Sequence, residues 1–264
     1  MKEIIYKTVG ERAIELLFYP PTEQTYTKAP LFLLIPGGGW NSSVAASMYG
    51  MERSAAEALR AAGFAVAAIS YRNHREDGVN MPAIVADVFD SAAYLAAHGE
   101  ELGIDPTRFY TSGHSAGGHL ALLLAYAPRN LYGEERTPFT VRATAPLSPP
   151  TWLPKEVYQP YLQFSIDGLF EGCTEEDYRL CSPETWVESA VPTLTAVGDK
   201  DDLVFPANGQ RLHDKLLAAG VRSEFVVAQN GGHAFEPIGA DTATPHFEDI
   251  QRQIVEFILD ENAR

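Results

Sequence analysis

The sequence predicts an α/β fold, with a mostly parallel central sheet, helices on both faces and a small cap insertion. Short, strongly apolar segments alternate with longer segments of helical periodicity over most of the chain. Several of the short segments lack the polar–apolar alternation of a half-exposed strand, so we expect strands buried on both faces. Strands and helices in alternation build a parallel sheet between two helical layers.

Length and composition predict one globular domain without a nucleic-acid or membrane partner. The chain has 264 residues, 45% of them hydrophobic, and shows no internal repeat or flexible linker. Because single α/β sheets commonly reach this length, we expect residues 1–264 to form one domain. The net charge of −15 argues against nucleic acids and anionic membranes, both of which require clustered lysine and arginine.

The start of the chain predicts a cytoplasmic protein, because an alternating strand pattern begins at once, without the apolar region of a signal peptide. No stretch approaches the ~18 consecutive apolar residues of a membrane span. Cys173 and Cys181 are the only cysteines; they could pair, but we expect reduced thiols. Neither Cys-x-x-Cys nor His-Glu-x-x-His occurs, so no metal site is predicted.

The N-terminal part of the chain predicts both edge and central strands. Residues 4–8 and 13–19 alternate apolar and polar side chains, which indicates an antiparallel pair at a sheet edge. Residues 31–35 are all apolar and predict a central strand, which is followed by a glycine-rich turn and a helix to about residue 62. Residues 64–70 predict the next buried strand.

A polar loop and a long helix are expected next. Residues 71–78 predict the loop, and the helix begins at about Pro82. Asp87 and Asp90 lie outside the apolar face of this helix, and we expect solvated carboxylates. A further strand is predicted at residues 141–147. The apolar face of the helix carries Val85, Phe89, Ala92 and Leu95.

Residues 148–187 interrupt the alternation with many prolines and aromatic residues. An insertion of this length is uncommon in a compact domain unless it is functional, so we expect a small cap over the carboxyl-terminal edge of the sheet. The alternative is a surface connection beneath which the aromatic side chains pack. Strands at residues 192–197 and 221–228 follow, with a helix after Pro206 and another at the end of the chain.

Ser115 is the predicted nucleophile. It lies at the centre of Gly-x-Ser-x-Gly, between a short strand at residues 108–110 and an apolar helix at residues 120–126. This context is typical of a nucleophile elbow, a turn so tight that Gly113 and Gly117 are needed to avoid clashes. The alternative is an ordinary serine in a glycine-rich turn.

A serine needs a base, and the base needs an orienting acid. His233 follows the last predicted strand in a Gly-Gly-His turn and is the predicted general base. Asp199, Asp201 and Asp202 are candidates for the acid; a Gly-x-x-Asp-x-x-Val pattern favours Asp201, with Asp202 second. All these residues follow strands, and parallel strands place such loops at one edge of the sheet.

Backbone N–H groups near Ser115 are the predicted oxyanion hole. One belongs to Ala116 and the others to Gly38 and Gly39. A phosphate cradle is the alternative for the glycine run, but no Gly-Lys-Ser/Thr follows it. His114 and His119 flank the elbow, and we expect them to orient neighbouring groups or to pack.

Several motifs together resemble those of α/β-hydrolases. They are Pro36-Gly37-Gly38-Gly39-Trp40, Gly113-His114-Ser115-Ala116-Gly117-Gly118-His119-Leu120, Gly198-Asp199-Lys200-Asp201 and Gly232-His233. Residues 103–108 and 182–185 narrow the resemblance to the carboxylesterase group of acetylxylan and feruloyl esterase-like and acetyl esterase/lipase proteins. The resemblance covers roughly residues 30–260. It implies an α/β-hydrolase fold and carboxylic ester hydrolysis without a cofactor.

One position departs from the related hormone-sensitive-lipase-like esterases, which have histidine where this chain has Pro36. Proline has no side-chain hydrogen bond with which to stiffen the glycine loop, although its fixed φ restricts the chain. Because members of the group act on different esters, substrate preference does not transfer.

The leading hypothesis is a serine esterase that cleaves short acyl groups, such as acetate, from a sugar or small alcohol. An amide or formamide hydrolase with the same three residues is the alternative enzyme, and a non-catalytic binding protein is the other alternative. Trp40, Trp152, Tyr158 and His114 are the predicted substrate-binding residues. We expect Trp40 and the aromatic insertion to narrow the acyl site; the alternative is that Trp40 faces the core.

Overall fold

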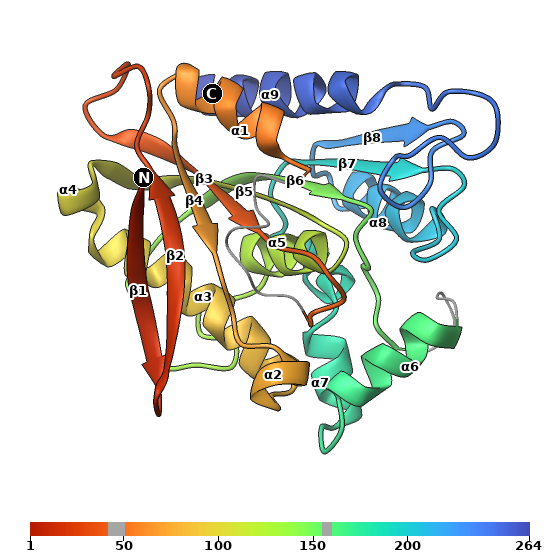
Figure 1. Ribbon diagram of the computed structural model, residues 1–264, viewed down its shortest axis with the longest axis horizontal. Coiled ribbons are helices and arrows are strands. Elements are labelled where there is room, and N and C mark those ends of the chain that lie inside the picture. The colour runs from red at the N-terminus through yellow and green to blue at the C-terminus, as the bar shows by residue number, and fades with distance from the viewer. Residues whose placement is uncertain (42–50, 155–159) are drawn as a thin grey trace.

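The computed structural model describes residues 1–41, 51–154 and 160–264, which form an eight-stranded sheet flanked by helices (Figure 1). The strand order is β1-β2-β4-β3-β5-β6-β7-β8. The pairs β1–β2 and β2–β4 are antiparallel and all other neighbours are parallel. The strands are β1 (Lys2–Val9), β2 (Arg12–Tyr19), β3 (Ala29–Ile35), β4 (Ala65–Ile69), β5 (Ile104–His114), β6 (Val141–Leu147), β7 (Thr193–Gly198) and β8 (Ser223–Ala228).

The helices connect these strands and differ in length. The longest, α3 and α9, pack on the sheet, whereas α2 and α4 are single turns. They are α1 (Arg53–Ala61), α2 (His74–Asp77), α3 (Met81–Ala97), α4 (Gly99–Leu102), α5 (Ala116–Tyr126), α6 (Pro160–Leu169), α7 (Glu175–Leu180), the 3₁₀ helix η2 (Pro183–Ser189), α8 (Ala207–Ala218) and α9 (Phe247–Ala263). None of the helices within the described residues is long and apolar enough to cross a membrane.

Strand burial follows the sequence pattern. Every residue of β3 is buried, as its continuous apolar sequence predicts for a central strand. In β2, buried residues alternate with more exposed ones, and β1 is mostly exposed at the sheet edge. The antiparallel edge pair expected from residues 4–19 is therefore confirmed.

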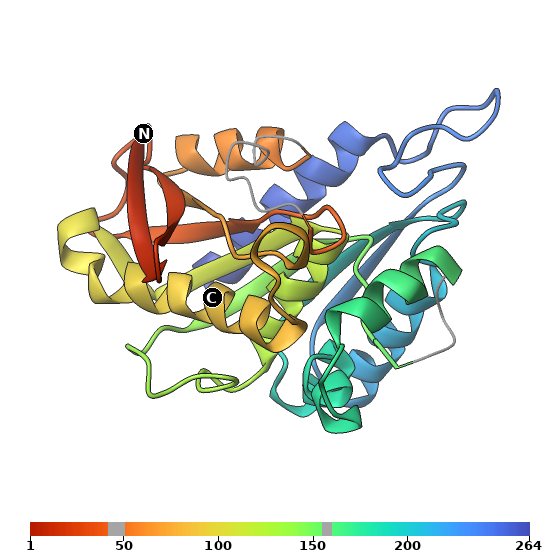
Figure 2. The ribbon, with the colours of Figure 1, turned by 60° about the horizontal axis from the view of Figure 1, so that its bottom comes forward.

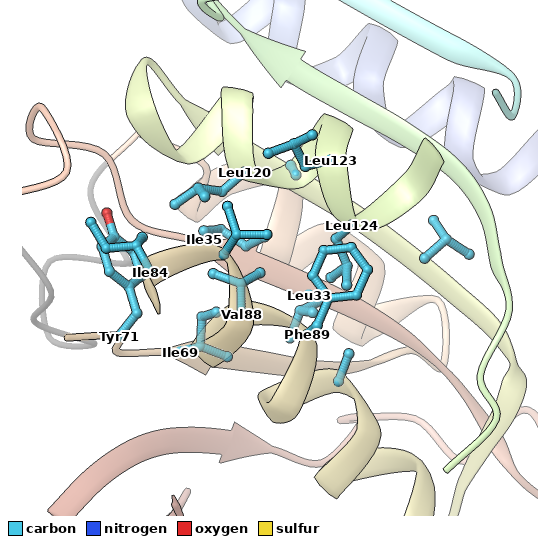
Figure 3. Close-up of a cluster of buried hydrophobic side chains, with 14 of the residues drawn as sticks. Leu33, Ile35, Ile69, Tyr71, Ile84, Val88, Phe89, Leu120, Leu123 and Leu124 are labelled. Atoms are coloured by element: carbon cyan, nitrogen blue, oxygen red, sulfur yellow. The ribbon is translucent and has the colours of Figure 1, made fainter. Parts of the chain in front are cut away.

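Helices cover both faces of the sheet, as predicted. The helices α1 and α9 pack against one another on one face, whereas α3, α5 and α8 cover the other (Figures 1 and 2). Between α3, α5 and the sheet lies the larger of the apolar cores. Figure 3 shows how side chains from these three layers meet, among them Leu33 on β3, Val88 on α3 and Leu120 on α5. This packing fixes α5 against the strand that precedes it.

Two local expectations need correction, and a third is only partly covered by the described residues. The strand before the elbow is longer than residues 108–110, because β5 begins at Ile104. The expected loop at residues 71–78 contains the helical turn α2, which Asn73 caps by accepting a hydrogen bond from the Glu76 N–H. The helix expected after Trp40 is described only as α1; residues 42–50 lie outside the described chain.

Asp87 is buried rather than solvated. Its carboxylate accepts hydrogen bonds from Arg72 Nε and Nη2 at 2.7 and 2.8 Å, and from Lys7 Nζ at 2.6 Å. Such pairing compensates the desolvation of a buried carboxylate. Asp90, which is part-exposed, contacts Lys7 and Arg136. Because these cations come from distant segments, the sequence of the helix alone gave no sign of the pairing.

Residues 148–187 contain α6, α7 and most of η2. The first two helices lie together at the lower right of Figure 1. Several apolar side chains of the segment are buried, including Leu153, Ile166 and Phe170. These side chains therefore pack into the domain, and a cap over the carboxyl-terminal edge of the sheet stays a prediction.

Candidate active site

Ser115 occupies a sharp turn between β5 and α5. Its φ of 56° and ψ of −121° are strained for a residue with a side chain. A Cβ at Gly113 would lie 2.5 Å from the Ile35 carbonyl oxygen, and one at Gly117 would clash with the same atom. The two glycines are therefore required by the close approach of β3, as the elbow prediction expects.

Ser115, His233 and Asp201 form a continuous hydrogen-bonded row. His233 Nε2 lies 2.9 Å from Ser115 Oγ, and His233 Nδ1 lies 2.7 Å from Asp201 Oδ2. Because the carboxylate can only accept, Nδ1 carries the proton and Nε2 accepts from the serine hydroxyl. The loops after β5, β7 and β8 supply these residues, so the parallel sheet brings together positions far apart in the sequence.

Of the three candidate acids, Asp201 is the one that contacts His233. The residue is 3% exposed, and its other oxygen, Oδ1, accepts the N–H groups of Leu203 and Val204 at 3.0 and 2.9 Å. Asp202 is exposed, and Asp199 pairs with Lys200. The backbone hydrogen bonds fix the carboxylate of Asp201, so its remaining oxygen is directed at the imidazole.

The glycine loop after β3 lies against the elbow. A Cβ at Gly37 would approach the His114 carbonyl oxygen to 2.5 Å, and Gly38, Gly39 and Trp40 all have positive φ. Asn41 closes the loop: its N–H donates to the Gly38 carbonyl oxygen and its Nδ2 to that of Gly39, at 3.1 and 2.9 Å.

The carbonyl of Pro36 is held from another strand. Tyr71, which follows β4, is fully buried, and its hydroxyl donates a 2.8 Å hydrogen bond to the Pro36 oxygen. Burial raises the pKa of Tyr71, so the hydroxyl remains a donor. The glycine loop is thus held at Pro36 by a tyrosine that follows the neighbouring strand β4.

Ala116 is the first residue of α5 and is buried beside the elbow. The N–H groups of a first helical turn have no intrahelical partner, and the positive end of the helix dipole favours negative charge. The Ser115 N–H is engaged differently, since it donates to the Leu147 oxygen at 2.8 Å. The role of the Ala116 N–H as an oxyanion donor stays a prediction.

A known family model matches most of the chain. The family model BD-FAE matches residues 16–216, a span that includes Ser115 and Asp201 and ends before His233. The chain belongs to the BD-FAE family.

Two curated relatives of the BD-FAE chain carry the names of ester hydrolases. The probable carboxylic ester hydrolase LipM of Mycobacterium tuberculosis is 26% identical over 226 residues, which cover 81% of this chain and 51% of LipM. The isoprenylcysteine α-carbonyl methylesterase ICME of Arabidopsis thaliana is 26% identical over 253 residues, covering 88% of this chain and 56% of ICME. The BD-FAE chain thus spans about half the length of these relatives.

Solved structures share its fold. The esterase Est2 of Thermogutta terrifontis aligns with a TM-score of 0.81 and 24% identity, over 98% of this chain and 93% of Est2. A truncated carbohydrate esterase from gut microbiota aligns with a TM-score of 0.78 and 21% identity, over 100% and 96% of the two chains. The predicted α/β-hydrolase fold is confirmed.

Two side chains hold the backbone of His233 in the BD-FAE protein. His114 Nε2 and Ser148 Oγ donate to the His233 carbonyl oxygen at 2.8 and 3.0 Å. The imidazole rings of His114 and His233 also lie close, with centroids 4.7 Å apart. Burial, followed by the neighbouring His233, lowers the pKa of His114 to about 4, so the ring stays neutral near pH 7. The side chain of His114 thus contacts the predicted base at the main-chain carbonyl oxygen of His233.

The predicted substrate-binding residues differ in their burial and surroundings. Trp40 is 0% exposed, and its Nε1 donates to His119 Nδ1 at 3.1 Å, so its side chain belongs to the core and not to an acyl pocket. Trp152 is half-buried, with Lys215 Nζ 5.6 Å from its ring centroid. It lines a pocket of about 560 Å³ with Tyr178 and Arg179 of the insertion. Tyr158 lies outside the described residues.

Sequence reasoning missed Tyr71 and Ser148. Tyr71 stood in a segment read as a polar loop, and Ser148 at the start of the insertion; neither has a local motif. Ser148 has a φ of 43°, a backbone signal that sequence does not display. Among the described residues no group of three or more His, Cys, Asp or Glu side chains could hold a metal ion. Cys173 and Cys181 are free thiols.

Proposed function

We propose that this BD-FAE protein is a serine carboxylesterase that hydrolyses short-acyl esters of small alcohols, with Ser115 as nucleophile, His233 as general base and Asp201 as the orienting acid. The hydrogen-bonded row from Ser115 Oγ through His233 to Asp201 carries the proposal. Nucleophile, base and orienting acid in hydrogen-bond contact are what serine hydrolysis requires. The names of the relatives LipM and ICME support an ester as substrate.

Acylation begins when Ser115 Oγ attacks the ester carbonyl carbon while His233 Nε2 takes the hydroxyl proton. The tetrahedral intermediate collapses, the C–O bond to the alcohol breaks, and His233 returns the proton to the departing alkoxide. Water then attacks the acyl-Ser115 ester, giving its proton to His233, and the carboxylic acid leaves as Ser115 regains its proton. Asp201 stabilises the imidazolium in both halves and keeps the tautomer that accepts from serine.

The developing oxyanion would accept hydrogen bonds from Ala116 N–H and from Gly38 and Gly39 N–H. The first belongs to the first residue of α5, beside Ser115, where the helix itself supplies no partner for the N–H group. The positive φ of both glycines, at 95° and 62°, supports a loop that turns its amides inward. Donors fixed before the reaction stabilise the transition state without reorganisation.

Short acyl groups are supported by one comparison. Structures of the Thermogutta esterase hold propionate or butyrate. Trp40 is fully buried and therefore does not narrow an acyl site. The sugar or small-alcohol portion remains a proposal, with the carbohydrate esterase of similar fold as its support.

The test is hydrolysis of 4-nitrophenyl esters from acetyl to octanoyl, beside a formyl-amide and an acetylated sugar. We expect kcat/KM to be highest for acetyl to butyryl esters and to fall with longer chains. Ser115→Ala removes the proposed nucleophile without adding bulk. This variant should retain the fold while losing nearly all turnover. Paraoxon, which phosphorylates the Thermogutta esterase, should label Ser115. Turnover by Ser115→Ala at the wild-type rate, or faster cleavage of the amide, would refute the proposal.

A further inference from the structure

His119 lies between the glycine loop and the insertion, with both of its ring nitrogens engaged. Trp40 Nε1 donates to Nδ1 at 3.1 Å, and Nε2 lies 2.7 Å from the carbonyl oxygen of Cys181. An indole nitrogen can only donate and a carbonyl oxygen can only accept. Both contacts therefore require the neutral imidazole with its proton on Nε2.

The surroundings of His119 keep this single form. The side chain is 0% exposed, and burial lowers its pKa to about 4. The Trp40 ring meets the imidazole edge to face, with centroids 5.3 Å apart and planes at 84°. The ring is thus held by packing as well as by hydrogen bonds, and a second orientation would leave a buried donor or acceptor unpaired.

Helix α5 thereby carries one half of the proposed oxyanion site and, through His119, a contact to the loop that carries the other half. Its first residue is Ala116, whose N–H is one donor, and His119 follows within the first helical turn. Trp40 directly follows Gly38 and Gly39, and it has a positive φ of 58° that a tryptophan adopts only when its surroundings hold it. Figure 1 shows β3 ending beside α5, so the glycine loop that follows β3 lies next to this helix.

We infer that His119 is a positioning residue for the proposed ester hydrolysis: through Trp40 it fixes the Gly38–Gly39 amides relative to Ala116. The inference rests on the proposed function. Cys181, just ahead of η2, sets the tautomer from the insertion side through its backbone carbonyl. The relevant quantity is the distance from the Ala116 N–H to the N–H groups of the Gly38–Gly39 loop. A loosened loop would change this distance while the catalytic hydrogen bonds proposed for Ser115, His233 and Asp201 stay intact.

The test compares an oxygen ester with its thionoester, whose C=S sulfur fits an oxyanion site poorly. Wild-type enzyme should prefer the oxygen ester strongly, and misplaced donors should reduce that preference. Trp40→Phe removes only the indole donor. His119→Phe removes the hydrogen bonds of both ring nitrogens while keeping an aromatic ring. We expect kcat for the oxygen ester to fall roughly 10- to 100-fold in each, less than the 10²–10³ lost with a whole oxyanion donor. KM should change little, and the ratio of oxygen-ester to thionoester rates should shrink.

Tyr126→Phe is the matched control. It removes a buried hydrogen bond, from Tyr126 to Thr193, on the same helix but at its far end. Its rate ratio should equal that of the wild type. His119→Gln, which can still donate toward Cys181 and accept from Trp40, should restore part of the ratio. Should His119→Phe fail to fold, Trp40→Phe carries the test.

Two failures are distinguishable. A wild-type protein that hydrolyses no ester refutes the proposed function, and the inference falls with it. A wild-type esterase whose ratio is unchanged in Trp40→Phe and His119→Phe overturns the inference alone, because a merely structural loss lowers both rates by the same factor.

Discussion

The Nε2–H of His114 donates a 2.8 Å hydrogen bond to the main-chain carbonyl oxygen of His233. The residue before Ser115 thus holds the backbone of the residue that faces Ser115 Oγ. Ser148, at the end of β6, adds a second donor to the same oxygen. The proposed nucleophile and the proposed base are therefore linked by a contact that is separate from the Ser115–His233 hydrogen bond.

Loss of this contact should lower turnover. His114→Phe keeps a ring beside His233 but removes the donor, and one hydrogen bond contributes about 1 kcal/mol, so we expect kcat to fall roughly five- to tenfold with little change in KM. Kinetics on a short 4-nitrophenyl ester measure it. His213→Phe is the control, because it also removes a histidine hydrogen bond, to Ser223, at a site without contact to His233. Wild-type kcat in His114→Phe would show that Ser148 alone suffices.

Substitution of the two neighbouring aspartates should separate their roles. Asp201→Asn should lower kcat by roughly 10⁴-fold, because an amide in place of the carboxylate favours the wrong tautomer of His233. Asp202→Asn is the matched control, since Asp202 is exposed and should change the rate less than about twofold. Rates of both variants, with circular dichroism to verify folding, decide the matter. The opposite ranking would assign the orienting role to Asp202.

Two glycines with different surroundings should differ in their tolerance of alanine. A Cβ at Gly117 would overlap the Ile35 carbonyl oxygen, and backbone cannot move aside as a flexible side chain can, so Gly117→Ala should cost about 3 kcal/mol or more of the free energy of unfolding. At Gly103, with φ of +68° and nothing within 4 Å of a Cβ, alanine should cost only about 1–2 kcal/mol. Urea denaturation measures both. Equal losses would mean that the close approach of β3 is not what requires glycine at the elbow.

Stability should depend on pH through Glu52. The residue is 7% exposed, its Oε1 has no hydrogen-bond partner among the described residues, and burial raises its pKa to about 7. The ordinary value is 4.5, so as pH rises from about 4.5 to about 7 the unfolded chain releases a proton that the folded protein retains. Stability is therefore fully present below this window and falls within it.

Replacement of Glu52 should remove this loss. Glu52→Gln should raise the free energy of unfolding by up to about 3 kcal/mol at pH 8 and by little at pH 4. Glu57→Gln is the control, because Glu57 is exposed on α1, the helix that Glu52 directly precedes. Urea denaturation at both pH values gives the difference. An equal gain at the two pH values would assign the effect to packing and not to protonation.

Some features of this protein follow from short stretches of sequence. The apolar run of β3 specifies a strand buried on both faces, because its side chains on either face of the sheet are apolar. Gly113 and Gly117 specify the turn around Ser115, because side chains there would collide with β3. Asp201 was favoured over Asp202 by the spacing of Gly198 and Val204, and the contact between Asp201 and His233 agrees with that choice.

What the sequence alone determined is therefore the fold class and the identity of the residues that meet at the site, since burial period, steric demand and turn chemistry are encoded within a few positions. Only the tertiary structure decided how those residues are held. Trp40 donates a hydrogen bond to His119, and Tyr71 donates one to the carbonyl oxygen of Pro36. The buried carboxylate of Asp87 accepts hydrogen bonds from Lys7 and Arg72. Each of these contacts joins segments on different strands or helices, and a hydrogen-bond partner across the fold leaves no pattern in the local sequence.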